Sequence, residues 1–406
     1  MEYSDLYADI AERTGGDIYI GVVGPVRTGK STLIKRFMEL MILPEISDEA
    51  FGRRARDELP QSASGRTIMT TEPKFVPKEA AQIKLSDDVT VNVRRIDCVG
   101  YMVDGASGHV EGNEERMVKT PWFDYEIPFT KAAAIGTQKV IHDHSTIGIV
   151  VTTDGSIGEL PRENYVAAEE KTVRELQSIG KPFLILLNCK KPYTEEAKAL
   201  QRSLEEKYGV SVVALNCEQM KVEDIHEIMR RVLYEFPVSE VAFYLPKWVE
   251  MLSIEHPIKQ ELLHTVQNLM QQLQDIRGAV RGIPKQETTY IEKIAVEKIE
   301  MGTGNVTVRI QFAEKFYYEV LSELTGTKIH GEYELISVMK ELASMKEEYT
   351  QIKDAFADVR MKGYGVVSPK KEEVVLEEPV IIRQGNKYGV KIHSEAPSIH
   401  MIRANI

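Results

Sequence analysis

A glycine-rich segment near the N-terminus carries the residue types that bind a nucleotide phosphate. Residues 24–31 read Gly-Pro-Val-Arg-Thr-Gly-Lys-Ser and stand between a strand pattern and a helical pattern, the order of a phosphate-binding loop. Glycines let backbone N–H groups point at a phosphate, and the helix N-terminus adds positive potential. Lys30 is expected to reach the β and γ oxygens, and Ser31 to offer its hydroxyl to Mg²⁺. The predicted nucleotide contacts of this segment are Gly24, Arg27, Thr28, Gly29, Lys30, Ser31 and Thr32.

A second motif, Asp97-Cys98-Val99-Gly100, follows another strand pattern. The Asp97 carboxylate can hold the Mg²⁺ water shell, and the Gly100 N–H can sense a γ-phosphate. Between the two motifs, residues 67–73 form a polar loop in which Thr70 and Thr71 are candidates for a switch threonine. Such a threonine binds Mg²⁺ through its hydroxyl and the γ-phosphate through its N–H. The predicted Mg²⁺ ligands are therefore Ser31, Asp97 and Thr70.

Two departures from the pattern of GTP-specific proteins bear on which nucleotide base is bound and on the rate of hydrolysis. Those proteins read guanine with the aspartate of Asn-Lys-x-Asp, whereas residues 188–191 here are Asn-Cys-Lys-Lys. The missing carboxylate at Lys191 favours ATP or loose base selection, while Asn188 remains a candidate nucleotide contact. Tyr101 stands at the position after Gly100 where related GTPases carry a water-orienting glutamine, so hydrolysis is expected to be slow or completed by another group.

Two further residues are candidates at the same end of the sheet. Arg27, inside the loop, either offsets γ-phosphate charge or forms an outward-facing salt bridge. Asp154 follows the strand pattern that begins at residue 147, and it is a candidate for positioning the attacking water.

Strand and helix patterns alternate through the part of the chain that carries these motifs. Apolar or alternating runs predict strands, and apolar residues at helical spacing predict helices. The predicted strands are 17–23, 89–96, 147–151, 183–187 and 210–215. The predicted helices are 30–41, 165–179, 195–207 and 222–234. Strands interleaved with helices predict an α/β fold with a mostly parallel sheet covered on both faces, here a P-loop NTPase domain over residues 1–238.

The pattern changes beyond this domain. A helix over 257–277, a hairpin over 290–312 and a helix over 313–324 predict a small α+β domain at 239–330. The last region, 331–406, is predicted to hold a long helix over 332–362, a loop over 368–378 and three short strands. These strands are expected at 380–383, 388–393 and 399–402. Apolar residues keep a three-four repeat along the long helix, so its apolar face either packs on its own domain or forms an intermolecular seam.

Composition excludes several classes of protein. The 406 residues suffice for two or three domains, and 43% hydrophobic with 28% charged residues is typical of soluble globular proteins. A net charge of -11 disfavours nucleic-acid binding. Three scattered cysteines indicate a reducing compartment. No signal-peptide pattern opens the chain, and its apolar runs are shorter than the roughly 20 residues of a membrane span, so we expect a cytoplasmic protein with peripheral membrane contact at most.

Several stretches together resemble the stage IV sporulation protein A family, the spore-coat morphogenetic ATPases of endospore-forming bacteria. They are DIAERTGGDIYIGVVG, VRTGKST, DELPQSASGRTIMTTEPKFVP, IDCVGY, DHSTIG, TTDGSIG, LYEFPV, IIRQG and APSIHMI. The resemblance implies a relative of the translation-factor GTPases that has exchanged guanine for adenine. By motif position, Lys30 corresponds to the phosphate-loop lysine, Asp97 to the Mg²⁺-side aspartate, and Thr70 with Thr71 to the sensor threonines.

The same resemblance implies a biological role. ATP hydrolysis would drive a conformational change, after which the protein assembles with itself into a static polymer, the base layer of the spore coat. That layer would cover the outer forespore membrane on the side of the mother-cell cytoplasm. The small amphipathic membrane-bound stage V sporulation protein M would recruit it to the membrane, and the layer would in turn recruit other coat proteins. Family members continue past Ile406, and the resemblance implies that their tail serves membrane docking and assembly.

Two alternatives stay open at the level of the sequence. A regulatory GTPase acting on a ribosome or another soluble partner needs a guanine reader and usually a basic face, and the sequence shows neither. A nucleotide-binding structural protein without catalysis is permitted by Tyr101 in place of a glutamine. Measurable turnover that depends on Lys30 would exclude this second alternative.

Overall fold

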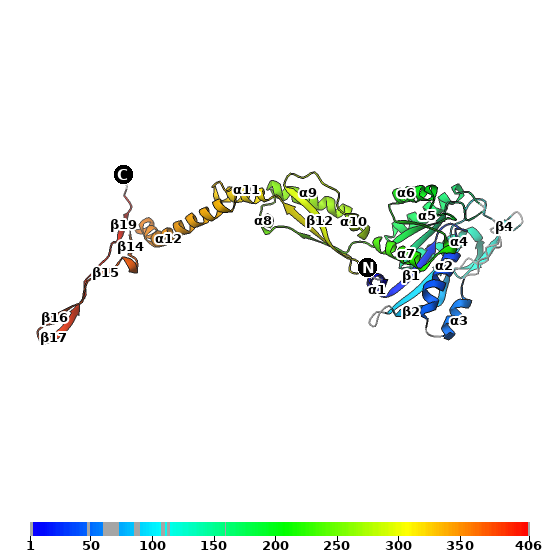
Figure 1. Cartoon of the computed structure of the whole chain (residues 1–406), viewed down its shortest axis with the longest axis horizontal. Coiled ribbons are helices and arrows are strands. Elements are labelled where there is room, and N and C mark those ends of the chain that lie inside the picture. The colour runs from blue at the N-terminus through cyan, green and yellow to red at the C-terminus, as the bar shows by residue number, and fades with distance from the viewer. Residues whose placement is uncertain are drawn as a thin grey trace. The chain divides into compact units, whose positions relative to one another are not determined.

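The computed structural model describes residues 3–46, 49–59, 73–84, 90–106, 110–111, 114–158 and 160–404 (Figure 1). The chain divides into two compact units, Met1–Gln311 and Phe312–Ile406. The three-domain division drawn from the sequence stays a prediction.

A six-stranded sheet forms the centre of the N-terminal part of the first unit. Its strand order is β10-β9-β8-β1-β3-β2, and every neighbouring pair is parallel except β2 with β3. The strands are β1 (Asp17–Val23), β2 (Lys74–Lys84), β3 (Thr90–Asp97), β8 (Ile147–Thr153), β9 (Phe183–Asn188) and β10 (Val212–Leu215). The predicted α/β fold with a mostly parallel sheet is confirmed.

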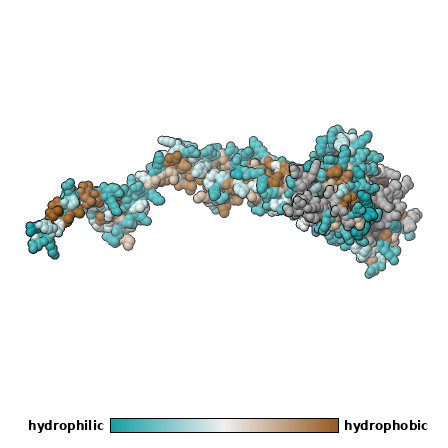
Figure 2. Space-filling view, turned by 60° about the horizontal axis from the view of Figure 1, so that its bottom comes forward, coloured by the Kyte–Doolittle hydropathy of each residue, from teal (hydrophilic) through white to brown (hydrophobic). Residues whose placement is uncertain are grey.

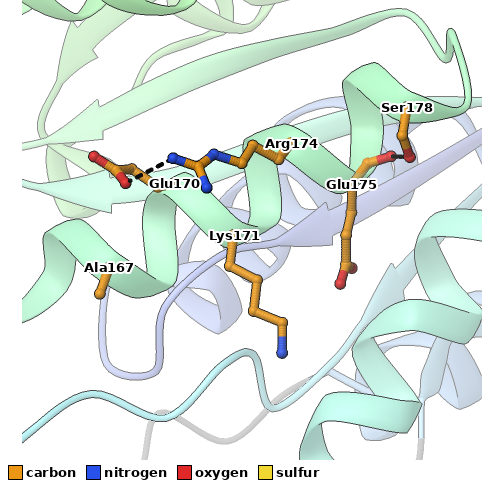
Figure 3. A pocket seen from close by; sticks show the side chains of 6 residues that line it. All are labelled: Ala167, Glu170, Lys171, Arg174, Glu175 and Ser178. Carbon is orange, nitrogen blue, oxygen red and sulfur yellow. Dashed lines mark hydrogen bonds and ion pairs between the residues drawn. The ribbon is translucent and has the colours of Figure 1, made fainter.

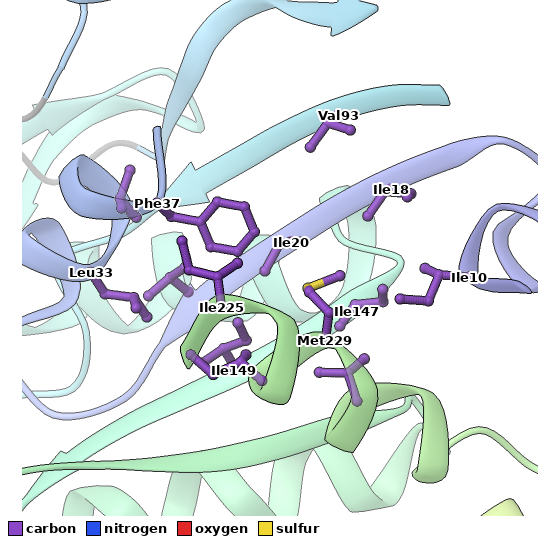
Figure 4. Close-up of a cluster of buried hydrophobic side chains, with 14 of the residues drawn as sticks. Ile10, Ile18, Ile20, Leu33, Phe37, Val93, Ile147, Ile149, Ile225 and Met229 are labelled. Carbon is purple, nitrogen blue, oxygen red and sulfur yellow. The ribbon is translucent and has the colours of Figure 1, made fainter. Parts of the chain in front are cut away.

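Alternating side chains of the strands point to opposite faces of the sheet, and each face forms one hydrophobic layer with the helices that cover it. Ile18 and Ile20 of β1 join α1 (Tyr3–Thr14), α2 (Lys30–Phe37) and α7 (Val222–Tyr234) in one layer, which Figure 4 shows. The opposite layer contains side chains of α5 (Glu163–Ser178), α6 (Glu195–Tyr208) and the π-helical turn Val140–His144. Every residue of β8 and β9 is buried, because both faces of these central strands are covered.

The remaining elements of this region are short or peripheral. The predicted helix over 30–41 is α-helical to Phe37 and continues as the π-helical turn Met38–Ile42. The other helical elements are Leu43–Glu45, α3 (Glu49–Asp57), α4 (Phe129–Lys139) and Cys217–Gln219. Two small hairpins consist of β4 (Val110–Glu111) with β5 (Glu114–Glu115), and of β6 (Met117–Thr120) with β7 (Phe123–Pro128).

A three-stranded sheet of order β11-β13-β12 follows. Its strands are β11 (Glu240–Tyr244), β12 (Ile291–Glu300) and β13 (Asn305–Phe312), so β12 and β13 occupy the predicted hairpin. The helices here are α8 (Lys247–Glu250), α9 (Pro257–Gln272) and α10 (Ile276–Arg281).

The single helix predicted over 257–277 is wrong, because the chain breaks between α9 and α10. The break pairs with the segment after α7: Val238 N donates to Gln274 O (2.9 Å), and Ile276 N donates to Phe236 O (3.0 Å). Asp275 then caps α10 by accepting from Gly278 N at 2.7 Å.

The second unit, as far as it is described (residues 312–404), contains two helices and three short strand pairs. The helices are α11 (Glu314–Thr325) and α12 (Glu332–Lys362). The strand pairs are β14 (Tyr364–Val367) with β19 (Ile399–Ile402), β15 (Val375–Leu376) with β18 (Ser394–Glu395), and β16 (Val380–Gln384) with β17 (Lys387–Lys391). The loop predicted over 368–378 thus contains β15 and the 3-10 turn Lys371–Glu373. Figure 2 shows hydrophobic side chains at the surface of this strand region, at the left of the view.

Candidate nucleotide-binding site

The segment between β1 and α2 forms a tight loop that wraps around the start of the helix. Gly24 has a φ of 128°, and a Cβ there would lie 2.4 Å from the carbonyl oxygen of Val151. Gly29 has a φ of 95°, and a Cβ there would lie 2.3 Å from Asn188 Nδ2. Both positions therefore require glycine, for backbone conformation and for space.

Lys30 is the first residue of α2, and its ammonium group lies against the loop. The residue is 5% exposed, and Nζ donates to Pro25 O at 2.6 Å and to Gly24 O at 3.4 Å. Burial lowers the pKa of Lys30, and the nearby Cys98 and Asp97 oppose that shift. The loop carbonyls thus hold a buried cation beside the backbone that is expected to bind phosphate.

Ser31 and Asp97, predicted to bind one metal ion, are in direct contact. Ser31 Oγ donates to Asp97 Oδ2 at 2.9 Å. The second carboxylate oxygen, Asp97 Oδ1, is buried and has no hydrogen-bond partner among the described residues. Burial raises the pKa of Asp97, while Lys30 and the Ser31 hydrogen bond oppose the rise. A hydroxyl and a carboxylate with an unsatisfied oxygen are a donor set that suits Mg²⁺.

The segment after Asp97 lies directly on the phosphate-binding loop. Gly100 has a φ of 92°, and a Cβ there would lie 2.0 Å from Gly24 O and 2.7 Å from Lys30 Nζ. Val26 N donates to Tyr101 O at 3.0 Å. The structure therefore brings Gly24, Lys30, Ser31, Asp97 and Gly100 together.

The Tyr101 side chain ties this segment to α5, a connection that sequence reasoning missed. Its hydroxyl donates to Glu175 Oε2, and Lys171 Nζ lies 4.2 Å from the centre of its ring. Burial and the Glu175 hydrogen bond raise the pKa of Tyr101. Glu175 and Lys171 also line a hollow on α5, in which both side chains point to the same side of the helix (Figure 3). No local sequence pattern links Tyr101 to a helix about seventy residues later.

Asn188 is 2% exposed, and its side-chain amide is hydrogen-bonded to the phosphate-binding loop. Its Nδ2 donates to Thr28 O at 2.9 Å, while Oδ1 accepts from Cys217 N at 3.0 Å. Both ends of the amide are thus engaged within the protein. Lys191, at the position of the absent guanine-reading carboxylate, is exposed.

The other predicted site residues are placed as follows. Asp154 Oδ1 accepts from Ser156 N (2.9 Å) and Ser156 Oγ (2.6 Å), which closes the turn after β8. Arg27 has a φ of 62° and opposes the burial-driven rise in the pKa of Tyr165. Thr32 lies in the first turn of α2. Thr70 and Thr71 lie outside the described residues.

A glycine-rich loop joins strand β1 to helix α2, which carries the buried Lys30, and Ser31 of α2 contacts Asp97 at the end of the neighbouring parallel strand β3. These features define a P-loop NTPase domain. Comparison with known families identifies the family to which this P-loop NTPase domain belongs. Residues 1–237 match the family model described as stage IV sporulation protein A, ATPase domain, and residues 238–406 match the middle domain of the same protein. The chain belongs to the stage IV sporulation protein A family, and is thus a sporulation protein with an ATPase domain.

Curated relatives extend over nearly the whole chain. The stage IV sporulation protein A of Clostridioides difficile (strain 630) is 48% identical over 99% of this chain and 82% of its own length. That of Bacillus subtilis (strain 168) is 46% identical over 100% of this chain and 83% of its own. Among solved structures, a mutation variant of SsGBP is 13% identical with a TM-score of 0.31, covering 57% of this chain and 60% of its own. Within the described part of the chain, every helix is too short or too polar to cross a membrane.

Proposed function

We propose that this chain binds ATP with Mg²⁺ and hydrolyses it slowly. The contact between Ser31 and Asp97, with Asp97 Oδ1 unsatisfied among the described residues beside the Lys30 ammonium, carries this proposal. Ser31 and Asp97 would hold Mg²⁺, which when bound neutralises charge on the β and γ phosphates. Lys30 and the loop N–H groups would bind the phosphate oxygens, and Thr70 with Thr71 would sense the γ-phosphate.

Two observations support the choice of ATP and the slow rate. Lys191 replaces the carboxylate that reads guanine, and the Asn188 amide is engaged by the protein itself. Tyr101, which stands in place of a water-orienting glutamine, has its hydroxyl bound to Glu175 on α5. The water would then be positioned by another group, for which Asp154 is the candidate.

The biological role that we propose is a self-assembling scaffold. Hydrolysis would switch the chain into a form that assembles into a static polymer, the base layer of the spore coat. We place that layer on the outer forespore membrane, facing the mother-cell cytoplasm. There the chain would bind the amphipathic stage V sporulation protein M and recruit other coat proteins. Membership of a sporulation family and the exposed apolar side chains of the second unit support this role.

Phosphate release from ATP and GTP, with and without Mg²⁺, tests the proposal on the wild-type chain and on Lys30→Ala. Each sample is then sedimented. We expect ATP to be preferred, Mg²⁺ to be required, and both hydrolysis and pelleting to be lost in Lys30→Ala. Preference for GTP without pelleting would instead support a regulatory GTPase, and pelleting of Lys30→Ala at the wild-type rate would rule out the switch.

A further inference from the structure

The long helix α12 carries an apolar stripe that is exposed from Leu342 to Tyr349. The seam is defined as Leu335, Val338, Leu342, Met345 and Tyr349, which follow one another at alternating spacings of three and four residues. Leu335 and Val338 are half-buried, whereas Leu342, Met345 and Tyr349 are 47%, 53% and 55% exposed. A helix whose apolar stripe faces water is stabilised when a partner covers that stripe.

The C-terminal end of α12 is covered differently. Ala355 is the one buried residue among the 31 of the helix, and a Cβ on Gly365 of β14 would lie 2.0 Å from Ala355 O. Strand β14 therefore packs against the last turns of α12. The part that remains available to a partner is the stretch that holds the seam.

Charged residues flank the seam with one sign on each side. In heptad notation, Leu335, Leu342 and Tyr349 are a positions, while Val338 and Met345 are d positions. The g positions that precede each a residue are Glu334, Glu341 and Glu348. The e positions from the second heptad onward are Lys346, Lys353 and Arg360.

Four of these flanking charges are not paired within the described part of the chain. Glu341, Lys346, Glu348 and Lys353 form no ion pair with any other residue that the structure describes. In contrast, Lys362 and Asp358 of the same helix pair at 2.9 Å, and Glu347 pairs with Lys370 at 3.6 Å. The four unpaired charges thus remain available to a partner that covers the seam.

The arrangement of signs selects both the partner and its direction. In a parallel, in-register pair of identical helices, each g residue faces the e residue five positions later on the other helix. Glu341 then meets Lys346 of the second copy, and Glu348 meets Lys353 of the second copy. In an antiparallel pair g faces g and e faces e, so glutamates would oppose glutamates and lysines would oppose lysines.

We infer that the seam of α12 binds the same seam of a second copy of this chain, parallel and in register, as a two-stranded coiled coil. The inference deepens the self-assembly proposed above and rests on it for its biological setting. Such a pair is isologous and closes on itself. The seam therefore makes a dimer as the building block, and polymer growth needs another surface.

Sedimentation equilibrium of the full chain without nucleotide tests the interface. Leu342→Glu with Met345→Glu places two charges in the seam and should raise the dimer Kd by about a hundredfold or more. The matched control, Ser344→Glu with Thr350→Glu, adds the same charges at outward-facing positions of α12 and should keep the wild-type Kd. A monomeric wild-type chain, or equal Kd values for the two double variants, would overturn the inference. Circular dichroism of each variant checks that α12 remains folded.

A disulfide crosslinking experiment tests direction and register. Val338→Cys should form an intermolecular disulfide on mild oxidation, because a parallel in-register pair places the two thiols together, whereas Ser337→Cys should not. The native cysteines Cys98, Cys189 and Cys217 are buried, which limits competing reactions. Equal crosslinking at residues 337 and 338 would contradict the register.

Charge reversal gives an independent test. Glu341→Lys with Glu348→Lys should abolish self-association, as should Lys346→Glu with Lys353→Glu, and mixing the two proteins should restore a heterodimer. No recovery on mixing would remove the electrostatic argument. ATP hydrolysis by the same samples separates the two proposals: a dimer without hydrolysis would contradict the ATPase proposal alone, and hydrolysis without a dimer would contradict this inference alone.

Discussion

At the scale of single residues, Asp97 combines a buried carboxylate with the role in Mg²⁺ binding that we propose for it. Its carboxylate is buried, and burial raises its pKa. Asp97→Asn removes the charge and keeps the size, so we expect hydrolysis to fall by about a hundredfold, while the midpoint of thermal unfolding changes little because the relieved desolvation of Asp97 offsets the lost attraction to the buried Lys30. Phosphate release and calorimetry measure both effects. Asp143→Asn, at an exposed pair with Lys139, should change neither, and wild-type hydrolysis by Asp97→Asn would contradict the metal assignment.

We expect His226 to make the stability of the first unit depend on pH. The side chain is buried on α7, its ring lies 5.9 Å from that of Tyr7, and burial lowers its pKa. The unfolded chain therefore binds more protons than the folded chain between the lowered pKa and the ordinary value of about 6.5. In that window, stability rises with pH and is lost as the pH falls. His226→Gln should reduce the fall in unfolding temperature between neutral and mildly acidic pH, and an unchanged fall would contradict this cause.

At the scale of elements, a buried ion pair lies within the α5 region, between its N-cap residue Arg162 and Glu169, and both partners hydrogen-bond to Thr152 of β8. Arg162 Nη2 lies 2.6 Å from Glu169 Oε2, and the Glu169 side chain is 0% exposed. The same carboxylate also accepts a hydrogen bond from Thr152 Oγ1 at 2.5 Å. Arg162→Met would leave a buried carboxylate without its counter-ion, which should cost about 3–5 kcal/mol in the free energy of unfolding. Urea denaturation measures this cost.

The same helix offers the matched control for that prediction. Arg174 pairs with Glu170 at 3.3 Å, but its side chain is 77% exposed. Arg174→Met should cost less than about 1 kcal/mol because water screens the pair. A cost for Arg162→Met no larger than that of Arg174→Met would show that the buried pair contributes no more than a surface one.

The elements also show what the sequence alone could predict. The central strands β8 and β9 were predictable because burial on both faces leaves an uninterrupted apolar run. Strand β2 was missed because it includes Pro77 and several charged residues and pairs at the sheet edge with a register shift between Val76 and Ala81. The break after α9 depends on pairing with residues 236–238, which no local spacing reveals.

The candidate site also contains residues that the sequence predicts and residues that it does not. Lys30, Ser31 and Asp97 follow from motifs, because strand order fixes where motif residues meet. The roles of Asn188 and Tyr101 could not be predicted, because each depends on hydrogen bonds to residues distant in the sequence. The electrostatic match of the α12 flanks is readable in the sequence, but the exposure of the seam is known from the structure alone.

At the scale of the whole molecule, Arg13 of α1 connects the nucleotide-binding region to the three-stranded sheet of the same unit. Its guanidinium donates to Ser239 Oγ at 2.9 Å, to Thr303 O at 3.0 Å and to Pro237 O. The fit is close, since a Cβ on Gly304 would lie 1.8 Å from Arg13 Nη1. One side chain of α1 thus holds both the linker after α7 and the turn between β12 and β13.

Removing this side chain should weaken the coupling between the two regions more than the stability of either. Arg13→Ala deletes three charge-assisted hydrogen bonds at a point where the regions meet, and because water competes for these exposed contacts their loss together should cost about 1–3 kcal/mol in net stability. We therefore expect calorimetry to resolve two unfolding transitions where the wild-type chain shows one, and limited proteolysis to cut near residues 237–239. Arg53→Ala, at an exposed pair with Glu49, is the control. A single sharp transition in Arg13→Ala would mean that the regions unfold together without this contact, and that a nucleotide-driven change could reach the middle region by another route.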